Sequence, residues 1–64
     1  MDRKQKLALF EGCYAAERKA DKYRQTHLDA LYKGEALGYQ DALATLELLR
    51  DYEEWKLLLN LSLI

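Results

Sequence analysis

Proline and valine are absent from this chain of 64 residues, and glycine occurs only three times. Proline and glycine are the residues that helix interiors tolerate least, and valine is one of the residues enriched in strands. Their scarcity excludes a β-rich fold and favours helix over most of the chain. The residues that dominate instead are strong helix formers, namely alanine, leucine, glutamate, lysine, arginine and glutamine. The sequence therefore predicts an all-α protein.

Cysteine and histidine each occur once, as Cys13 and His27. A disulfide within the chain is thus excluded, and this pair cannot supply the four ligands of a structural zinc site. No glutamate is followed three residues later by histidine, as in helical carboxylate metal sites. We expect no metal, no cofactor, no catalytic residue and hence no enzyme. Cys13 is expected to be a small core residue, and His27 a half-buried interface residue.

A strong net charge and a long apolar run are also missing. The formal net charge is −1, so no global field attracts the chain to nucleic acid or to an anionic membrane. The apolar C-terminus, residues 57–64, is shorter than the roughly 20 apolar residues that span a bilayer. No signal peptide is recognisable at the start. We expect a cytoplasmic protein without a membrane span.

Apolar residues recur at helical spacing along the chain. In the first half one stripe, with spacings of three and four residues, predicts a single buried helix face. In the second half two stripes lie well apart on a helical wheel, and a helix with two apolar faces needs two neighbours. The first stripe is Leu9, Cys13, Ala16, Ala20, Tyr23, His27 and Ala30; the other two are Tyr39, Ala42, Leu43, Leu46, Leu49 and Leu57, and Leu37, Ala44, Leu48, Tyr52, Trp55 and Leu59.

The break between the halves is predicted at Gly34, since glycine readily takes the left-handed conformation that ends a helix. This gives one domain over residues 1–64: a helix over 3–33, a turn over 34–37 and a helix over 38–60, folded as an antiparallel hairpin. Asp2 is suited to cap the first helix. The alternative is one long helix in an antiparallel coiled-coil-like assembly, which the glycines would allow to pack closely.

A chain of this length is marginal as a monomer, because it buries only about 60% of the surface that its unfolded form exposes. With disulfides and zinc excluded, oligomerisation is the stabilising route that remains. We expect the hairpin to dimerise into a four-helix bundle, with the apolar C-terminus docked on another subunit. The predicted oligomer interface is Leu37, Tyr39, Leu46, Leu48, Leu49, Tyr52, Trp55 and Leu59.

Two functions remain open. The first is a non-enzymatic, oligomeric protein-interaction module, since five tyrosines and one tryptophan suit interfaces. The second is a small nucleic-acid-binding helical bundle that uses the densest basic cluster of the chain, although Glu17 and Asp21 dilute its charge. That cluster, which is also the candidate partner-binding site, is Arg18, Lys19, Lys22 and Arg24.

Residues 31–43, with the sequence Leu-Tyr-Lys-Gly-Glu-Ala-Leu-Gly-Tyr-Gln-Asp-Ala-Leu, resemble a segment of small α-helical proteins of phages and prophages in Gram-positive bacteria. Such proteins commonly act as inhibitors or adaptors of a host protein. The resemblance implies no catalytic residue. It implies a protein-binding role, in which the chain acts on a host partner.

Overall fold

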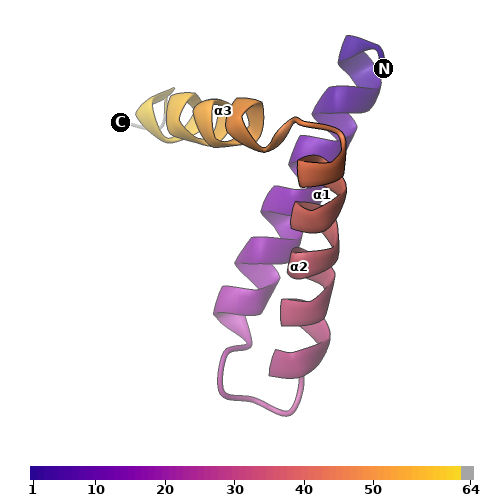
Figure 1. Ribbon diagram of the computed structural model, residues 1–64. Helices are drawn as coiled ribbons and strands as arrows, with labels where there is room; N and C mark the ends of the chain where they lie inside the picture. Colours follow the sequence, from indigo (N-terminus) through magenta and orange to yellow (C-terminus); the bar gives the residue numbers. More distant parts are fainter. Residues whose placement is uncertain (63–64) are drawn as a thin grey trace.

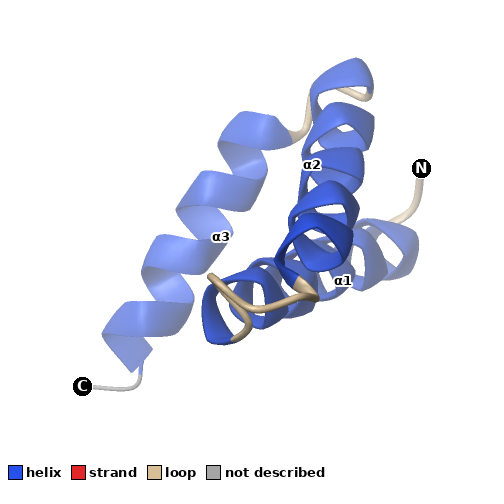
Figure 2. Ribbon diagram, turned by 90° about the horizontal axis from the view of Figure 1, so that it is seen from below, coloured by secondary structure: helices blue, strands red, loops and turns tan. Residues whose placement is uncertain are grey.

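The computed structural model describes residues 1–62, which form three α-helices joined by two short turns (Figure 1). The helices are α1 (Arg3–Lys22), α2 (Asp29–Thr45) and α3 (Leu49–Ser62). The absence of strands within residues 1–62 confirms the all-α prediction. α1 and α2 pack side by side as an antiparallel hairpin, and α3 crosses one face of it (Figures 1 and 2).

The start of α1 is fixed by a capping box, as the sequence predicts for Asp2. The backbone N–H of Gln5 donates to Asp2 Oδ1 at 2.8 Å, and the backbone N–H of Asp2 donates to Gln5 Oε1 at 3.3 Å. Such a cap stabilises a helix by about 1 kcal/mol. At the other end, Lys19 and Lys22 lie in the last turn, where positive charge favours the helix dipole.

The hairpin turn lies at residues 23–28, so the predicted turn at residues 34–37 is wrong. Gly34 and Gly38 lie inside α2, where neither has a positive φ. Glycine permits a break without requiring one. The turn forms instead where side chains satisfy the free backbone groups: the Thr26 hydroxyl donates to the Tyr23 carbonyl and accepts from the Leu28 N–H at 3.2 Å.

The same turn corrects the prediction for His27. A helix continued to residue 33 would place this side chain on the apolar stripe of the first half. In the structure Gln25 takes the left-handed conformation (φ 66°) and the chain reverses, so His27 lies in the turn and is exposed. Among residues 1–62 it is therefore not part of a buried interface.

The second turn, which ends α2, contains neither glycine nor proline. Glu47 takes the left-handed conformation there (φ 59°). The Leu48 N–H donates to the Leu43 carbonyl at 2.8 Å, and the Glu47 N–H donates to the Ala44 carbonyl at 3.1 Å. These two bonds make a Schellman motif with glutamate at the position that glycine usually occupies.

This turn overturns both predicted architectures of the second half. The helix expected over residues 38–60 is divided into α2 and α3, and the alternative of one uninterrupted helix is wrong as well. The physical reason is that breaking the helix lets the apolar face of α3 pack on α1 of the same chain. The third helix thus supplies the second neighbour that a two-helix hairpin lacks.

The core lies where the three helices meet. One contiguous buried cluster consists of Phe10, Cys13, Leu43 and Tyr52. In this cluster Tyr52 of α3 packs on Phe10 of α1, with ring centroids 5.6 Å apart. Trp55 covers the same region and meets Phe10 at 5.7 Å and Tyr14, edge to face, at 5.9 Å. Cys13 is a fully buried core residue, as predicted. The buried residues are Phe10, Cys13, Ala16, Ala36, Leu43 and Tyr52.

The Tyr39 side chain of α2 lies against Gly12 of α1. A Cβ atom added there would lie 2.7 Å from the hydroxyl oxygen of Tyr39, and 2.8 and 2.9 Å from two ring carbons. The Tyr39 ring therefore lies over the bare backbone of α1. Any larger residue at position 12 forces this ring to move outwards.

Gly12→Ala should therefore have opposite effects in two backgrounds. Alanine gains up to about 1 kcal/mol of helix propensity over glycine, but in the native chain it displaces the Tyr39 ring. In a Tyr39→Ala background the clash is gone, and the full gain should appear. Urea unfolding of the four variants measures the coupling. Equal effects of Gly12→Ala in both backgrounds would show that the ring does not pack on Gly12.

Candidate interaction surface

The outward face of α3 carries exposed leucines. Leu57, Leu58 and Leu61 are 62%, 64% and 59% exposed. On a helix with 100° per residue they centre on the side opposite Tyr52, whose side chain is fully buried against α1. We call these three residues the leucine face. Of the two stripes predicted for the second half, only Leu57 lies on this face, and Leu58 and Leu61 belong to the apolar C-terminus. Within residues 1–62 no side chain covers the leucine face.

The end of α3 that bears the leucine face extends away from the hairpin (Figures 1 and 2). The chain exposes 5117 Å², whereas a compact monomer of its mass exposes roughly 4,250 Å² by surface-to-mass scaling. The excess is several hundred square ångströms, comparable with the roughly 800 Å² that each partner buries in a standard interface. The single chain therefore exposes more surface than a compact monomer of the same mass would expose.

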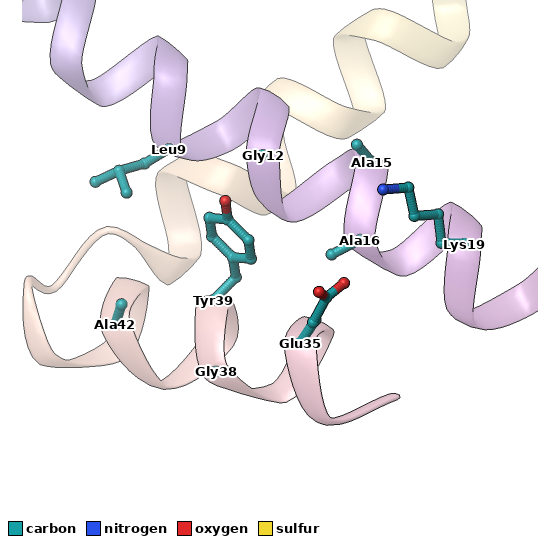
Figure 3. A pocket seen from close by; sticks show the side chains of 9 residues that line it. All are labelled: Leu9, Gly12, Ala15, Ala16, Lys19, Glu35, Gly38, Tyr39 and Ala42. Atoms are coloured by element: carbon teal, nitrogen blue, oxygen red, sulfur yellow. The ribbon is translucent and has the colours of Figure 1, made fainter. Parts of the chain in front are cut away.

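A shallow groove of about 550 Å³ runs between α1 and α2 (Figure 3). Its surface is formed largely by glycine and alanine, while Lys19 and Glu35 lie at one end and Leu9 at the other (Figure 3). Tyr39 points across it toward Gly12. The groove offers apolar contact but no cluster of polar groups that would hold a small ligand. Its lining residues are Leu9, Gly12, Ala15, Ala16, Lys19, Glu35, Gly38, Tyr39 and Ala42.

Glu17 is the polar centre of the fold. The carboxylate of this α1 residue accepts a hydrogen bond from the Tyr52 hydroxyl and, at 2.9 Å, one from Gln40 Nε2 of α2. Lys56 of α3 lies 3.5 Å from the same carboxylate, and both side chains of this ion pair are about three-quarters buried. One carboxylate therefore ties all three helices together. From the sequence, Glu17 is predicted only to dilute the charge of the basic cluster. Its position next to Ala16 of the first apolar stripe is the one indication in the sequence that it lies near the core.

Two proton-bearing groups, Cys13 and Tyr52, are buried beside this carboxylate. Burial raises the pKa of the Cys13 thiol above its ordinary value of 9.0. Burial, and then the hydrogen bond to Glu17, raises the pKa of Tyr52 well above its ordinary value of 10.0. Both groups are thus held neutral, because neither a thiolate nor a phenolate is stable in this apolar, acidic environment. A thiol held protonated is a poor nucleophile.

These raised pKa values predict loss of stability in alkali. Above about pH 9 the unfolded chain loses protons from Cys13 and Tyr52 that the folded chain retains, so ionisation favours the unfolded state. Each group can contribute up to about 1.4 kcal/mol per pH unit. Thermal unfolding followed between pH 8 and 10.5 should show a falling melting temperature. Tyr52→Phe should flatten that dependence, and an unchanged slope would contradict the assignment.

The fold divides the predicted oligomer interface into three groups. Leu48, Tyr52 and Trp55 pack against the core of their own chain, so in the single chain they are not free for a partner as the prediction expected. The reason is the turn before α3, which brings these side chains back onto α1. Leu59 is half-buried. The residues that stay exposed are Leu37, Tyr39, Leu46 and Leu49.

The predicted basic cluster is brought together at the closed end of the hairpin, where all four side chains are exposed. Three of its cations lie over tyrosine rings: Arg18 over Tyr14 at 5.7 Å, Lys19 over Tyr32 at 5.7 Å and Lys22 over Tyr23 at 5.4 Å. Arg24 lies 3.9 Å from Asp21. The four cations thus form one exposed basic surface, and each lies near a tyrosine ring or a carboxylate of its own chain.

Among residues 1–62, no group of three or more histidine, cysteine, aspartate or glutamate side chains is placed to hold a metal ion. In the same part of the chain, no helix combines the length and hydrophobicity needed to cross a membrane. Residues 63–64, the end of the apolar C-terminus that was predicted to dock on another subunit, lie outside the described residues.

Comparisons with family models, with curated proteins and with solved structures found no match to this chain.

Proposed function

We propose that this chain is a non-enzymatic, self-associating protein-interaction module. The observation that carries the proposal is the leucine face of α3, which is exposed on a helix whose opposite side is buried in the core. Leaving three adjacent leucines in water forgoes the free energy that their burial would release, about 1.5–3 kcal/mol for each side chain. Clustered exposed apolar residues mark interaction sites in soluble proteins.

The first partner we assign to this surface is a second copy of the chain. Self-association covers the leucine face and supplies the burial that a domain of this size lacks. The surplus of exposed surface matches one side of an ordinary interface. Residues 31–43 resemble a segment of phage proteins that inhibit host proteins or act as adaptors. We therefore propose that the self-associated chain acts as an inhibitor or adaptor of a host protein.

The test replaces leucines of the face with lysine. A buried lysine without a partner is strongly unfavourable, so Leu57→Lys with Leu61→Lys should shift the protein to a monomer in sedimentation equilibrium at micromolar concentration. Leu31→Lys is the matched control, because Leu31 is equally exposed but lies near the hairpin turn. A native chain that sediments as a monomer at these concentrations would refute the proposal.

A further inference from the structure

The turn between α2 and α3 has a sequence that favours helix. Residues 44–50 read Ala-Thr-Leu-Glu-Leu-Leu-Arg, and leucine, glutamate and arginine are among the best helix formers. Glu47 nevertheless takes a left-handed conformation, which costs non-glycine residues free energy and is normally left to glycine. Local preference and observed conformation therefore disagree at this point of the chain. We call residues 46–48 the hinge.

What holds the hinge closed is the docking of α3 on α1. Tyr52 and Trp55 pack on the core, and the Glu17 carboxylate binds both Tyr52 and Lys56. Further out, an exposed ion pair joins Lys6 and Asp51 at 2.9 Å. These contacts join α1 to α3 through residues outside the hinge, although Leu48 of the hinge also packs against the core. An α3 from a second copy can make every one of them.

We propose that two copies of the chain associate by exchanging α3. The hinge straightens, α2 and α3 become one helix, and each α3 docks on α1 of the other copy through Tyr52, Trp55 and Lys56. This inference rests on the proposed self-association and specifies its partner and its geometry. The continuous helix, residues 29–62, would be about 50 Å long.

The exchange conserves the contacts between α1 and α3, so its driving force comes from elsewhere. Each copy releases the left-handed conformation of Glu47 and gains helical hydrogen bonds across the hinge. Short hinges under strain are a recognised cause of such exchange. The leucine face, exposed in the closed chain, is the apolar surface available for new contact between the two copies.

The first experiment changes the hinge alone. Glu47 is exposed, so Glu47→Gly and Glu47→Ala form a matched pair that leaves the core untouched. Glycine stabilises the closed hinge and destabilises the continuous helix of the dimer, whereas alanine favours that helix. The effect counts twice, because each dimer opens two hinges. The dissociation constant of the glycine variant should therefore exceed that of the alanine variant at least about tenfold in sedimentation equilibrium. Equal constants would refute the exchange.

The second experiment uses charge reversal of the buried ion pair. Glu17→Lys alone and Lys56→Glu alone each bring like charges together in their own chain. In an exchanged dimer that contains one copy of each variant, one site pairs Lys at 17 with Glu at 56 and the other restores the native pair. Mixing the two variants should therefore produce a 1:1 dimer in native mass spectrometry, with a melting temperature above that of either variant. The chain carrying both reversals is the control for the reversed pair.

The outcomes separate the two proposals. Rescue on mixing supports the exchange even where a single variant fails to fold alone, because no contact within one chain can be repaired by another. A native dimer whose variants show no rescue refutes the exchange and leaves contact through the leucine face as the mode of association. A native chain that is monomeric refutes both the exchange and the proposed function.

Discussion

Replacing Tyr52 with alanine is expected to unfold this protein at room temperature. Removal of a fully buried aromatic side chain from a core typically costs about 3–5 kcal/mol. A single core in a chain of fewer than about 70 residues rarely supplies more than that amount. Tyr52 is fully buried and contacts both Phe10 and Trp55. Far-UV circular dichroism and urea titration of Tyr52→Ala measure the loss.

Tyr52→Phe is the control that keeps the ring. It removes only the hydroxyl that donates to Glu17, and a hydrogen bond to a charged group contributes about 1.5–3 kcal/mol. The phenylalanine variant should therefore fold, with reduced stability and an unaltered helical spectrum. If alanine and phenylalanine cost the same free energy, the ring contributes little and the position of α3 has been misassigned.

Replacing Glu17 with alanine is expected to have the second-largest effect among single substitutions. The change leaves the Tyr52 hydroxyl without its acceptor in the core, and it removes the partner of Gln40 and one of the two carboxylates beside Lys56. An unsatisfied buried donor costs about 1–3 kcal/mol, and Lys56 adds less because it keeps its second ion pair, with Glu53 at 3.5 Å. Hydrogen exchange should show that amides of α3 lose more protection than those of the hairpin.

Glu17→Gln separates the shape of this residue from its charge. Glutamine can still accept from Tyr52, so its cost should be clearly smaller than that of alanine. A Tyr52→Phe change in the Glu17→Ala background should add little, because the two substitutions remove one shared hydrogen bond. Strictly additive costs would indicate that Glu17 and Tyr52 stabilise the fold independently.

The basic cluster and the leucine face are two surfaces whose presence, but not whose detailed contacts, can be predicted from the sequence. Both are visible in the sequence, one as a run of cations and the other as an apolar C-terminus. The sequence does not reveal that cations of the cluster lie over Tyr14, Tyr23 and Tyr32. Two of these contacts are local, because Arg18 lies one helical turn after Tyr14 and Lys22 precedes Tyr23 in the chain. Only the contact of Lys19 with Tyr32 joins α1 to α2 and depends on the folded hairpin.

The sequence by itself determined helical structure, the cap at Asp2, the burial of Cys13 and the presence of more apolar surface than two helices can cover. These properties follow from local propensity, from side chains that bond their own backbone, and from helical periodicity. Each depends on residues within a few positions of one another. These properties can therefore be predicted from the sequence without knowledge of the fold.

Tertiary structure decided where the helices end and what the aromatic residues face. Gly34 is suited to end a helix but lies inside α2. Glu47 adopts the left-handed conformation usual for glycine, because the chain must turn there for α3 to pack on α1. The packing of α3 on α1 also brings Tyr52 and Lys56 to the Glu17 carboxylate, which binds Gln40 of α2 as well. The free energy of packing a second apolar face exceeds the cost of one left-handed residue, and that balance depends on residues distant in sequence.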